Sequence, residues 1–379
     1  MIQPKRVTSG PKQHFFGYYD KAQWDFSDRW LLGCAADVAG RQPSPNDVLT
    51  LGMIDTQSSD GFMPFASTKA WCWQQGCMLQ WLPGSDAEVI YNDRIGDRFV
   101  SIIRNVQTGE WRILPRPVYS VSPDGRYAVS LNFSRLDWAR PGYGYAGITD
   151  WRADVDAPSD DGVFVMDLAT GKHHLVISLY EMRALETDCS MLGVHHWVNH
   201  LLFNPSGTRF VYLHRWFSED TGGFATQLCT ANADGSDMFV SQLSRSSHFI
   251  WEDDTTILIW GADRGVPGYY RLQDKTDAKE RIGENVLVRD GHCTVSPDKR
   301  WLLTDEYPDA TNRRALLLYD LKEDYRVDIA HLQNDPSLTG PLRCDLHPRF
   351  NRQGDQVCID SVHEGARQMY CFDVSAVVQ

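Results

Sequence analysis

Short hydrophobic runs alternate with turns rich in Gly, Asp, Asn and Pro along nearly the whole chain. Runs of this length are typical of β-strands, and the tight turns between them are typical of hairpins. Helical periodicity is scarce, and the one stretch that predicts a helix is short, from Leu179 to Leu185. The pattern therefore predicts an all-β protein.

The turns and the strands that follow them repeat along the chain. Four clear copies open with the tetrapeptides Ser-Pro-Asp-Gly, Asn-Pro-Ser-Gly, Ser-Pro-Asp-Lys and Asn-Arg-Gln-Gly, which begin at Ser122, Asn204, Ser296 and Asn351. Weaker copies begin at Asp25, Pro83 and Glu252. Four strands per unit and seven units, at spacings of roughly 40 to 60 residues, predict a seven-bladed β-propeller. The units fill residues 1–379 as a single domain, with a loop excursion around residues 135–161.

Histidine recurs at one position of this repeat. Counting four residues back from the turn gives histidine in four consecutive units, at His200, His248, His292 and His347. The first strand of each blade lines the central channel of a propeller, so equivalent positions gather around one mouth of that channel. Buried polar groups without partners are costly, and we therefore expect the four imidazoles to face a polar pocket rather than a dry interface between blades.

Further polar side chains are expected at the same mouth. The second strand of each unit runs antiparallel to the first, and its end offers His214, Arg215, Arg264 and His363. The arginines present planar forks suited to a carboxylate, although surface salt bridges would use them equally well. Four further residues are expected either at the edge of this mouth or in the packing between blades, namely His14, Tyr18, Lys21 and Gln75.

Three residues of the last two units form a candidate metal site. His292, Asp345 and His347 are a mixed nitrogen and oxygen set that suits manganese, iron or zinc. Replacement of one of them by Cys344 or Cys293 would favour zinc. The alternative is a hydrogen-bonded cluster that holds no metal.

Charge and cysteine content narrow the class of protein further. The 37 basic and 50 acidic side chains give a net charge of -13, which argues against nucleic acid or an anionic membrane as the main partner. No apolar stretch is long enough to span a membrane, and residues 1–10 lack the apolar core of a secretion signal. The nine scattered cysteines favour a reducing compartment, and we expect a cytoplasmic protein.

The histidine-bearing segments resemble those of the β-propeller polysaccharide lyases, namely the oligogalacturonate lyases and, more distantly, the ulvan lyases. The segments that carry the resemblance are Asn199-His200, Leu213-His214-Arg215-Trp216, Ser247-His248-Phe-Ile-Trp251, Gly291-His292 and Asp345-Leu-His347-Pro-Arg-Phe350. The resemblance implies a catalytic base at His248 and a manganese site at His292 and His347. The chain departs from the oligogalacturonate lyases in offering Asp345 and Leu342 where those enzymes have His and Gln as manganese ligands. The ulvan lyases differ again, with a catalytic Tyr where His248 stands and an Arg at a position like Arg264.

The chemistry of these residues fits β-elimination from a uronic acid. The proton next to the carboxylate is weakly acidic, and its removal requires a neutralised carboxylate and a base that titrates near neutral pH. We expect His248 to be the base, Arg264 and a divalent metal to neutralise the carboxylate, and His200 and His214 to assist the leaving oxygen or bind substrate. The expected partner is an acidic oligosaccharide.

The sequence also bears on other functions that propellers perform. A glycoside hydrolase needs two facing carboxylates, and the aligned ring positions carry none. A propeller that binds acidic glycans or proteins without catalysis is the main alternative, because this architecture hosts many functions.

Overall fold

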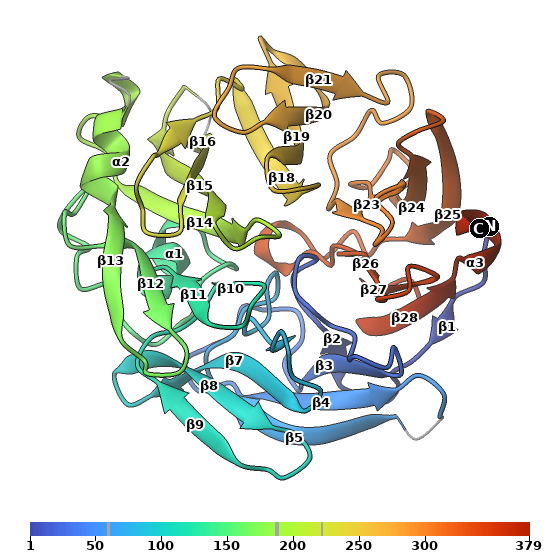
Figure 1. Cartoon of the computed structure of the whole chain (residues 1–379). Coiled ribbons are helices and arrows are strands. Elements are labelled where there is room, and N and C mark those ends of the chain that lie inside the picture. The colour runs from blue at the N-terminus through green and yellow to red at the C-terminus, as the bar shows by residue number, and fades with distance from the viewer. Residues whose placement is uncertain (59–60, 186–188, 221–222) are drawn as a thin grey trace.

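Seven four-stranded antiparallel sheets stand in a ring in the structure, a computed structural model that describes residues 1–58, 61–185, 189–220 and 223–379 (Figure 1). The protein is thus a seven-bladed β-propeller, as the repeat predicted. In six of the seven blades, hydrogen-bonded neighbours follow one another in the sequence, and hairpins connect most of the successive strands. None of the helices in the described ranges has the length and apolar character needed to span a lipid bilayer.

The first three blades use the first half of the chain. The first consists of β2 (Gln13–Phe15), β3 (Trp30–Ala36), β4 (Leu49–Asp55) and β5 (Phe62–Thr68). The second consists of β6 (Gln80–Trp81), β7 (Glu88–Ile95), β8 (Arg98–Asn105) and β9 (Trp111–Leu114). The third consists of β10 (Ser120–Val121), β11 (Tyr127–Ser130), β12 (Gly162–Asp167) and β13 (His173–Ser178).

The next three blades follow the same plan. The fourth consists of β14 (His196–Phe203), β15 (Arg209–Ser218), β16 (Gly223–Asn232) and β17 (Phe239–Val240). The fifth consists of β18 (Arg245–Trp251), β19 (Thr256–Asp263), β20 (Val266–Gln273) and β21 (Lys279–Ile282). The sixth consists of β22 (Thr294–Val295), β23 (Trp301–Asp305), β24 (Arg313–Asp320) and β25 (Tyr325–Gln333).

Both ends of the chain build the seventh blade and so close the ring. It consists of β26 (Arg349–Phe350), β27 (Gln356–Ser361), β28 (Gln368–Asp373) and, as its outermost strand, β1 (Lys5–Arg6). The two termini consequently lie side by side, near the short helix α3 (Ser375–Val378) (Figure 1). Inside this blade, the Asp360 carboxylate accepts hydrogen bonds from the backbone N–H of Phe16 and from Arg349. Asp360 therefore ties the N-terminal segment to the last blade.

The core lies between neighbouring blades. In β24, Leu316 and Leu318 pack with Ile359 of the last blade, whereas Leu317 packs with Leu258 of the fifth blade. Successive side chains of a strand point to opposite faces, and both faces of a propeller blade are covered by neighbours. This explains why the inner strands read as nearly continuous hydrophobic runs.

The helix predicted at residues 179–185 is present as α2 (Leu179–Leu185). The excursion around residues 135–161 contains a helix that the sequence pattern did not predict, α1 (Phe133–Ala139), whose N-terminus is capped by the Asn132 side chain. The described ranges also contain two 3-10 helices, Cys189–Met191 and Gly340–Leu342. The buried Arg135 of α1 pairs with Asp150 at 2.9 Å and donates to the backbone carbonyl of His196 in β14 at 2.6 Å, which holds the excursion against the fourth blade.

Candidate active site at the mouth of the channel

The four histidines of the repeat gather around Tyr18 and Tyr19. The ring centroids of His248 and His292 are 4.0 Å apart, and those of His292 and His347 are 4.3 Å apart. Tyr18 lies between His200 and His347, with ring centroids 4.9 and 5.2 Å away. All four imidazoles are buried. The structure therefore brings side chains from four consecutive blades into one polar cluster.

Irregular backbone points these histidines inward. The register of β14 shifts between Asn199 and Leu202, and that of β18 shifts between Ser246 and Phe249. These β-bulges contain His200 and His248. His200 and His347 adopt left-handed backbone conformations, with φ of 51° and 44°. Such conformations are uncommon for residues other than glycine and are typical of functional sites.

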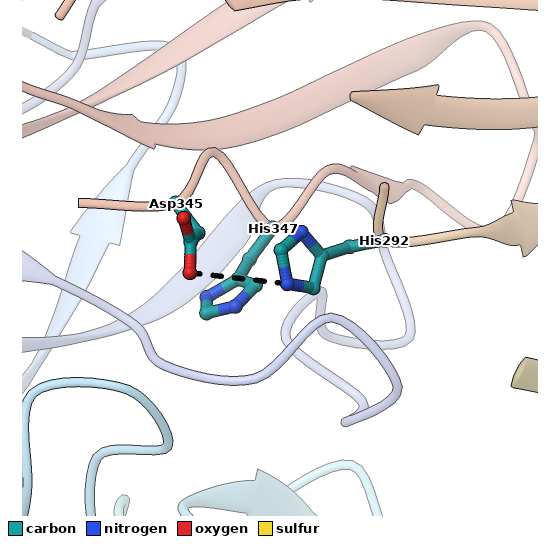
Figure 2. A group of neighbouring side chains, drawn as sticks. All are labelled: His292, Asp345 and His347. Carbon is teal, nitrogen blue, oxygen red and sulfur yellow. Dashed lines mark ion pairs between the residues drawn. The ribbon is translucent and has the colours of Figure 1, made fainter. Parts of the chain in front are cut away.

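His292, Asp345 and His347 form a compact group, in which one ligand atom of each residue lies within 4.8 Å of the others (Figure 2). Asp345 and His347 both precede β26 and lie in irregular chain, so strand alternation does not set the directions of their side chains. The left-handed turn at His347 folds its ring back toward Asp345. All three side chains are almost completely buried.

The unsatisfied atoms of this group suit a divalent cation. His292 is fixed through Nδ1, which lies 2.9 Å from a carboxylate oxygen of Asp305, so its Nε2 faces the group. Nε2 of His292 and Nε2 of His347 have no hydrogen-bond partner in the described part of the chain. Burial and the nearby His292 hold the pKa of His347 well below its usual range, which keeps that ring neutral and able to ligate. Two free imidazole nitrogens beside a carboxylate fit a divalent metal.

Asp345 also carries a second role. Arg314 and Arg343 approach its two oxygens at 2.8 and 2.6 Å. Burial alone would raise the pKa of Asp345, but the two guanidinium groups outweigh it and hold the pKa well below its usual range. The carboxylate is therefore ionised and shared between the arginines and the candidate metal site.

A cavity of about 1050 Å³ opens beside the histidine cluster, between the fourth and fifth blades. Its walls include side chains of the excursion, of β15 and of β18, among them Tyr18, Arg140, Tyr143, Arg215, Phe224, Arg245, His248, Asp290 and Tyr307. The volume suits a ligand at the large end of the small-molecule range, such as an oligosaccharide of a few units. The candidate metal ligands lie behind the cavity, in contact with its lining residues His248 and Tyr18.

His248 is the one histidine of the ring that lines this cavity among the described residues. Its Nδ1 lies 2.9 Å from the carboxylate of Asp290, which also accepts a hydrogen bond from Ser247. With Nδ1 donating to Asp290, the Nε2 lone pair remains available for a proton. Burial, followed by the neighbouring His292, lowers the pKa of His248, and Asp290 opposes that change. The ring is therefore neutral at neutral pH.

Arg215 is a buried cation that faces the cavity with free donors. Its side chain stacks on Phe224, and its Nε and Nη1 have no partner among the described residues. Its exposed fraction is only 5%. A buried guanidinium with unused N–H groups is costly unless a ligand supplies acceptors, so this wall is suited to an anion.

Several predicted site residues lie elsewhere. Arg264 is exposed at the tip of the hairpin between β19 and β20, with φ of 49°. His14 is buried against Phe62 of the first blade, and His363 bonds to Ser361 in the last blade. These three residues do not line the cavity in the described structure. The ends of the second strands do not all meet at this mouth, because these strands differ in length, with 10 residues in β15 and 5 in β23.

His214 is buried within the fourth blade rather than presented to the cavity. Its Nε2 lies 2.8 Å from Nδ1 of His196, and the two rings stack. Burial and His196 lower the pKa of His214 to about 3, so it stays neutral. The arrangement makes His214 a packing residue.

The remaining predicted residues lie in the channel or behind it. Lys21 is buried and pairs with Asp20 at 2.9 Å, and Asp20 also contacts Nε2 of His200. Gln75 donates a hydrogen bond to the hydroxyl of Tyr119. Cys344 is outside the candidate metal group, and burial raises the pKa of its thiol to about 11. A neutral thiol is a poor metal ligand.

Sequence reasoning missed residues that lie outside the repeat register. Asp290 precedes β22 in irregular chain, and Arg314 and Arg343 come from β24 and from the segment before β26. Tyr143 comes from the excursion. The segment Pro141-Gly-Tyr-Gly-Tyr145 belongs to the predicted loop excursion, but no periodic signal connects it with the histidines.

The fold and the site together define a seven-bladed β-propeller with a histidine cluster at one mouth of its channel. Two solved structures share this fold over nearly their whole length. An oligogalacturonate lyase from Vibrio parahaemolyticus has a TM-score of 0.70 at 15% identity, and the match covers 98% of this chain and 94% of the lyase. An oligogalacturonate lyase in complex with manganese has a TM-score of 0.71 at 14% identity, and the match covers 98% and 93%.

The resemblance to oligogalacturonate lyases is thereby confirmed at the level of the fold. The tricorn protease is more distant, with a TM-score of 0.53 at 12% identity over 97% of this chain and 34% of its own. Neither a protein-family model nor a curated protein sequence matches the chain.

Proposed function

We propose that the protein is a lyase that cleaves uronic-acid-containing oligosaccharides by β-elimination. The observation that carries this proposal is the neutral His248, which lines a cavity that also contains the unpaired donors of Arg215. A base that is neutral at working pH and a fixed cation for the carboxylate are the two groups that the reaction requires. The likeness in fold to two oligogalacturonate lyases supports the same class of reaction.

In this proposal the substrate lies in the cavity with its carboxylate against Arg215. Nε2 of His248 takes the proton from the carbon next to that carboxylate. Asp290 holds the His248 ring in the required tautomer and stabilises the imidazolium that forms. Arg215 takes the neutralising role that the sequence suggested for Arg264, because Arg215 and not Arg264 is at the cavity.

His292, Asp345 and His347 would hold a divalent cation, for which manganese is our first choice and zinc the second. Bound there, the cation would supply Lewis-acid stabilisation of negative charge. The absence of Cys344 from the group favours manganese over zinc, because oxygen and imidazole ligands suit manganese and thiolate suits zinc.

The alternative is a propeller that binds acidic glycans without catalysis. The same Arg215 wall would serve that function, so binding alone does not separate the two. Asp290 favours the enzyme, because a carboxylate that orients a neutral histidine at a cavity wall and stabilises the imidazolium formed from it is suited to proton transfer.

The test compares His248→Ala with His363→Ala in the presence of manganese. The substrate is oligogalacturonate, and the readout is the ultraviolet absorbance of the new double bond. We expect His248→Ala to lose activity by about a hundredfold or more and His363→Ala, which is remote from the cavity, to keep it. Unchanged turnover by His248→Ala would end the assignment of the base.

We further propose that the protein works in a reducing compartment. The nine cysteines are all free, which suits a reducing compartment such as the cytoplasm.

A further inference from the structure

Three tyrosines line the cavity, and their hydroxyl environments differ. They are Tyr18, Tyr143 and Tyr307. The hydroxyl of Tyr143 accepts a hydrogen bond from Nη2 of Arg343 at 2.6 Å. The guanidinium of Arg140 lies 4.2 Å from the centroid of the Tyr143 ring. Tyr143 is therefore the cavity tyrosine that has one cation at its oxygen and another over its ring.

The backbone around Tyr143 is built to hold this side chain in place. Gly142 has φ of 93°, and a Cβ there would lie 2.5 Å from Cβ of Pro341. A Cβ at Gly144 would lie 2.1 Å from the backbone nitrogen of Asp137 in α1. Only glycine fits at these two positions, so the chain passes closely between α1 and the 3-10 helix Gly340–Leu342. Tyr143 projects into the cavity from this fixed point.

The hydroxyl proton of Tyr143 is free to be transferred. The oxygen accepts from Arg343, and no acceptor for its own proton occurs among the described residues. By contrast, the buried Tyr19 and Tyr119 donate to a backbone carbonyl and to a side-chain amide oxygen. The hydroxyl of Tyr143 can therefore donate its proton to a ligand in the cavity.

The charges around Tyr143 favour its ionised form. Burial alone would raise its pKa, but Arg343 and Arg140 outweigh that effect and lower it, against a smaller opposing contribution from Asp345. Tyr18 and Tyr307 have pKa values raised well above the usual range, chiefly by burial. The three tyrosines share one cavity and differ in how readily they release a proton.

We infer that Tyr143 is the general acid of the reaction, which protonates the leaving sugar oxygen while His248 acts as the base. This inference rests on the proposed function and deepens it. It assigns a catalytic role to the excursion, which the propeller repeat itself does not require.

The proton balance of the step is complete. Nε2 of His248 takes the proton next to the carboxylate, and the electron pair of that bond forms the new double bond. The bond from the neighbouring ring carbon to oxygen breaks, and the leaving oxygen takes the hydroxyl proton of Tyr143. Water then reprotonates the Tyr143 phenolate, and the His248 imidazolium returns its proton to water. Nothing is oxidised or reduced.

The test uses two substrates that differ in whether the leaving oxygen must be protonated. One is oligogalacturonate, whose leaving group is a sugar alkoxide that must be protonated. The other is a galacturonide with a dinitrophenyl ether at the same oxygen, because dinitrophenolate leaves without a proton. We expect Tyr143→Phe to lower kcat by about a hundredfold or more on the first substrate and by less than about tenfold on the second. His248→Ala should lose activity on both, because both need the base.

Tyr145→Phe is the matched control from the same excursion. Tyr145 is buried, and its hydroxyl accepts a hydrogen bond from Asn92, outside the cavity. Any loss that it causes through packing should be equal on the two substrates. If Tyr143→Phe does not fold, Arg140→Gln takes its place and should lower kcat more on oligogalacturonate than on the aryl ether.

Equal losses on both substrates, or no loss on oligogalacturonate, would overturn the role of Tyr143. These results differ from a failure of the proposed function, in which the wild-type protein would form the double bond from neither substrate.

Discussion

Replacing Asp290 by asparagine tests the proposed base through its pH dependence. Asp290 accepts a hydrogen bond from Nδ1 of His248 at 2.9 Å, and both side chains are largely buried. The carboxylate stabilises the imidazolium and so raises the pKa of His248 against the lowering by burial. The neutral amide of the introduced asparagine can still accept that hydrogen bond but carries no charge. The substitution therefore removes charge and preserves the tautomer.

The size of the effect follows from the hydrogen bond. A hydrogen bond to a charged group contributes about 1.5–3 kcal/mol, and one pKa unit corresponds to about 1.4 kcal/mol. The pKa of His248 should fall by about one to two units. The base is active when neutral, so kcat/KM falls as pH drops through that pKa. The acid limb of the profile should thus move to lower pH, and the plateau should fall roughly threefold to tenfold because a weaker base removes the proton more slowly.

The assay follows the rise in ultraviolet absorbance with oligogalacturonate between acidic and neutral pH. Ser247→Ala is the control of opposite sign, because Ser247 donates to Asp290 and its removal leaves the carboxylate a stronger partner for His248. That variant should not move the acid limb downward. An acid limb that stays in place or moves to higher pH in Asp290→Asn would refute His248 as the base.

Three further predictions concern stability and metal. Asp360→Ala should lower the free energy of unfolding by about 3–5 kcal/mol in urea titrations, because it leaves Arg349 buried without its partner; a loss below about 1 kcal/mol would contradict the closure that we describe. The pKa of His214 lies at about 3 in the folded protein, below its unfolded value of about 6.5. Its contribution to stability is therefore complete above pH ~6.5 and is lost as pH falls toward the folded pKa. Melting temperatures should decline over this window, and the decline should be shallower in His214→Gln; equal slopes would count against the burial of a neutral imidazole. Finally, His347→Ala should lose bound manganese in elemental analysis after dialysis, and retention equal to the wild type would exclude His347 as a ligand.

The fold was predictable from the sequence because its cause is periodic. Each blade needs four short strands and tight turns, and these leave tetrapeptides such as the one at Ser122 in the same place in four of the seven units. The closure of the last blade by β1 has no such signal, since two exposed residues, Lys5 and Arg6, form that strand. Helix α1 is too short to leave a clear helical pattern, and a polar residue such as its N-cap Asn132 also occurs in ordinary turns.

The residues of the candidate site were predictable where they follow the repeat, and the prediction failed where they do not. The aligned position selected His248, His292 and His347, because equivalent backbone positions in a ring of blades meet at the axis. Arg264 comes directly after β19, the second strand of its blade, and because the second strands differ in length from blade to blade, this position has no equivalent at the mouth. Tyr143 reaches the cavity from an insertion in one blade, and only the folded chain reveals that placement.

Product masses measured in isotopically labelled water test the assignment as a lyase most directly. Elimination divides the oligosaccharide without adding water, so the masses of the two products should sum to that of the substrate, with no label incorporated and one new double bond. Products that together gain one labelled water would identify a hydrolase. A substrate that is bound but never cleaved would show that the protein is a glycan-binding propeller and not an enzyme.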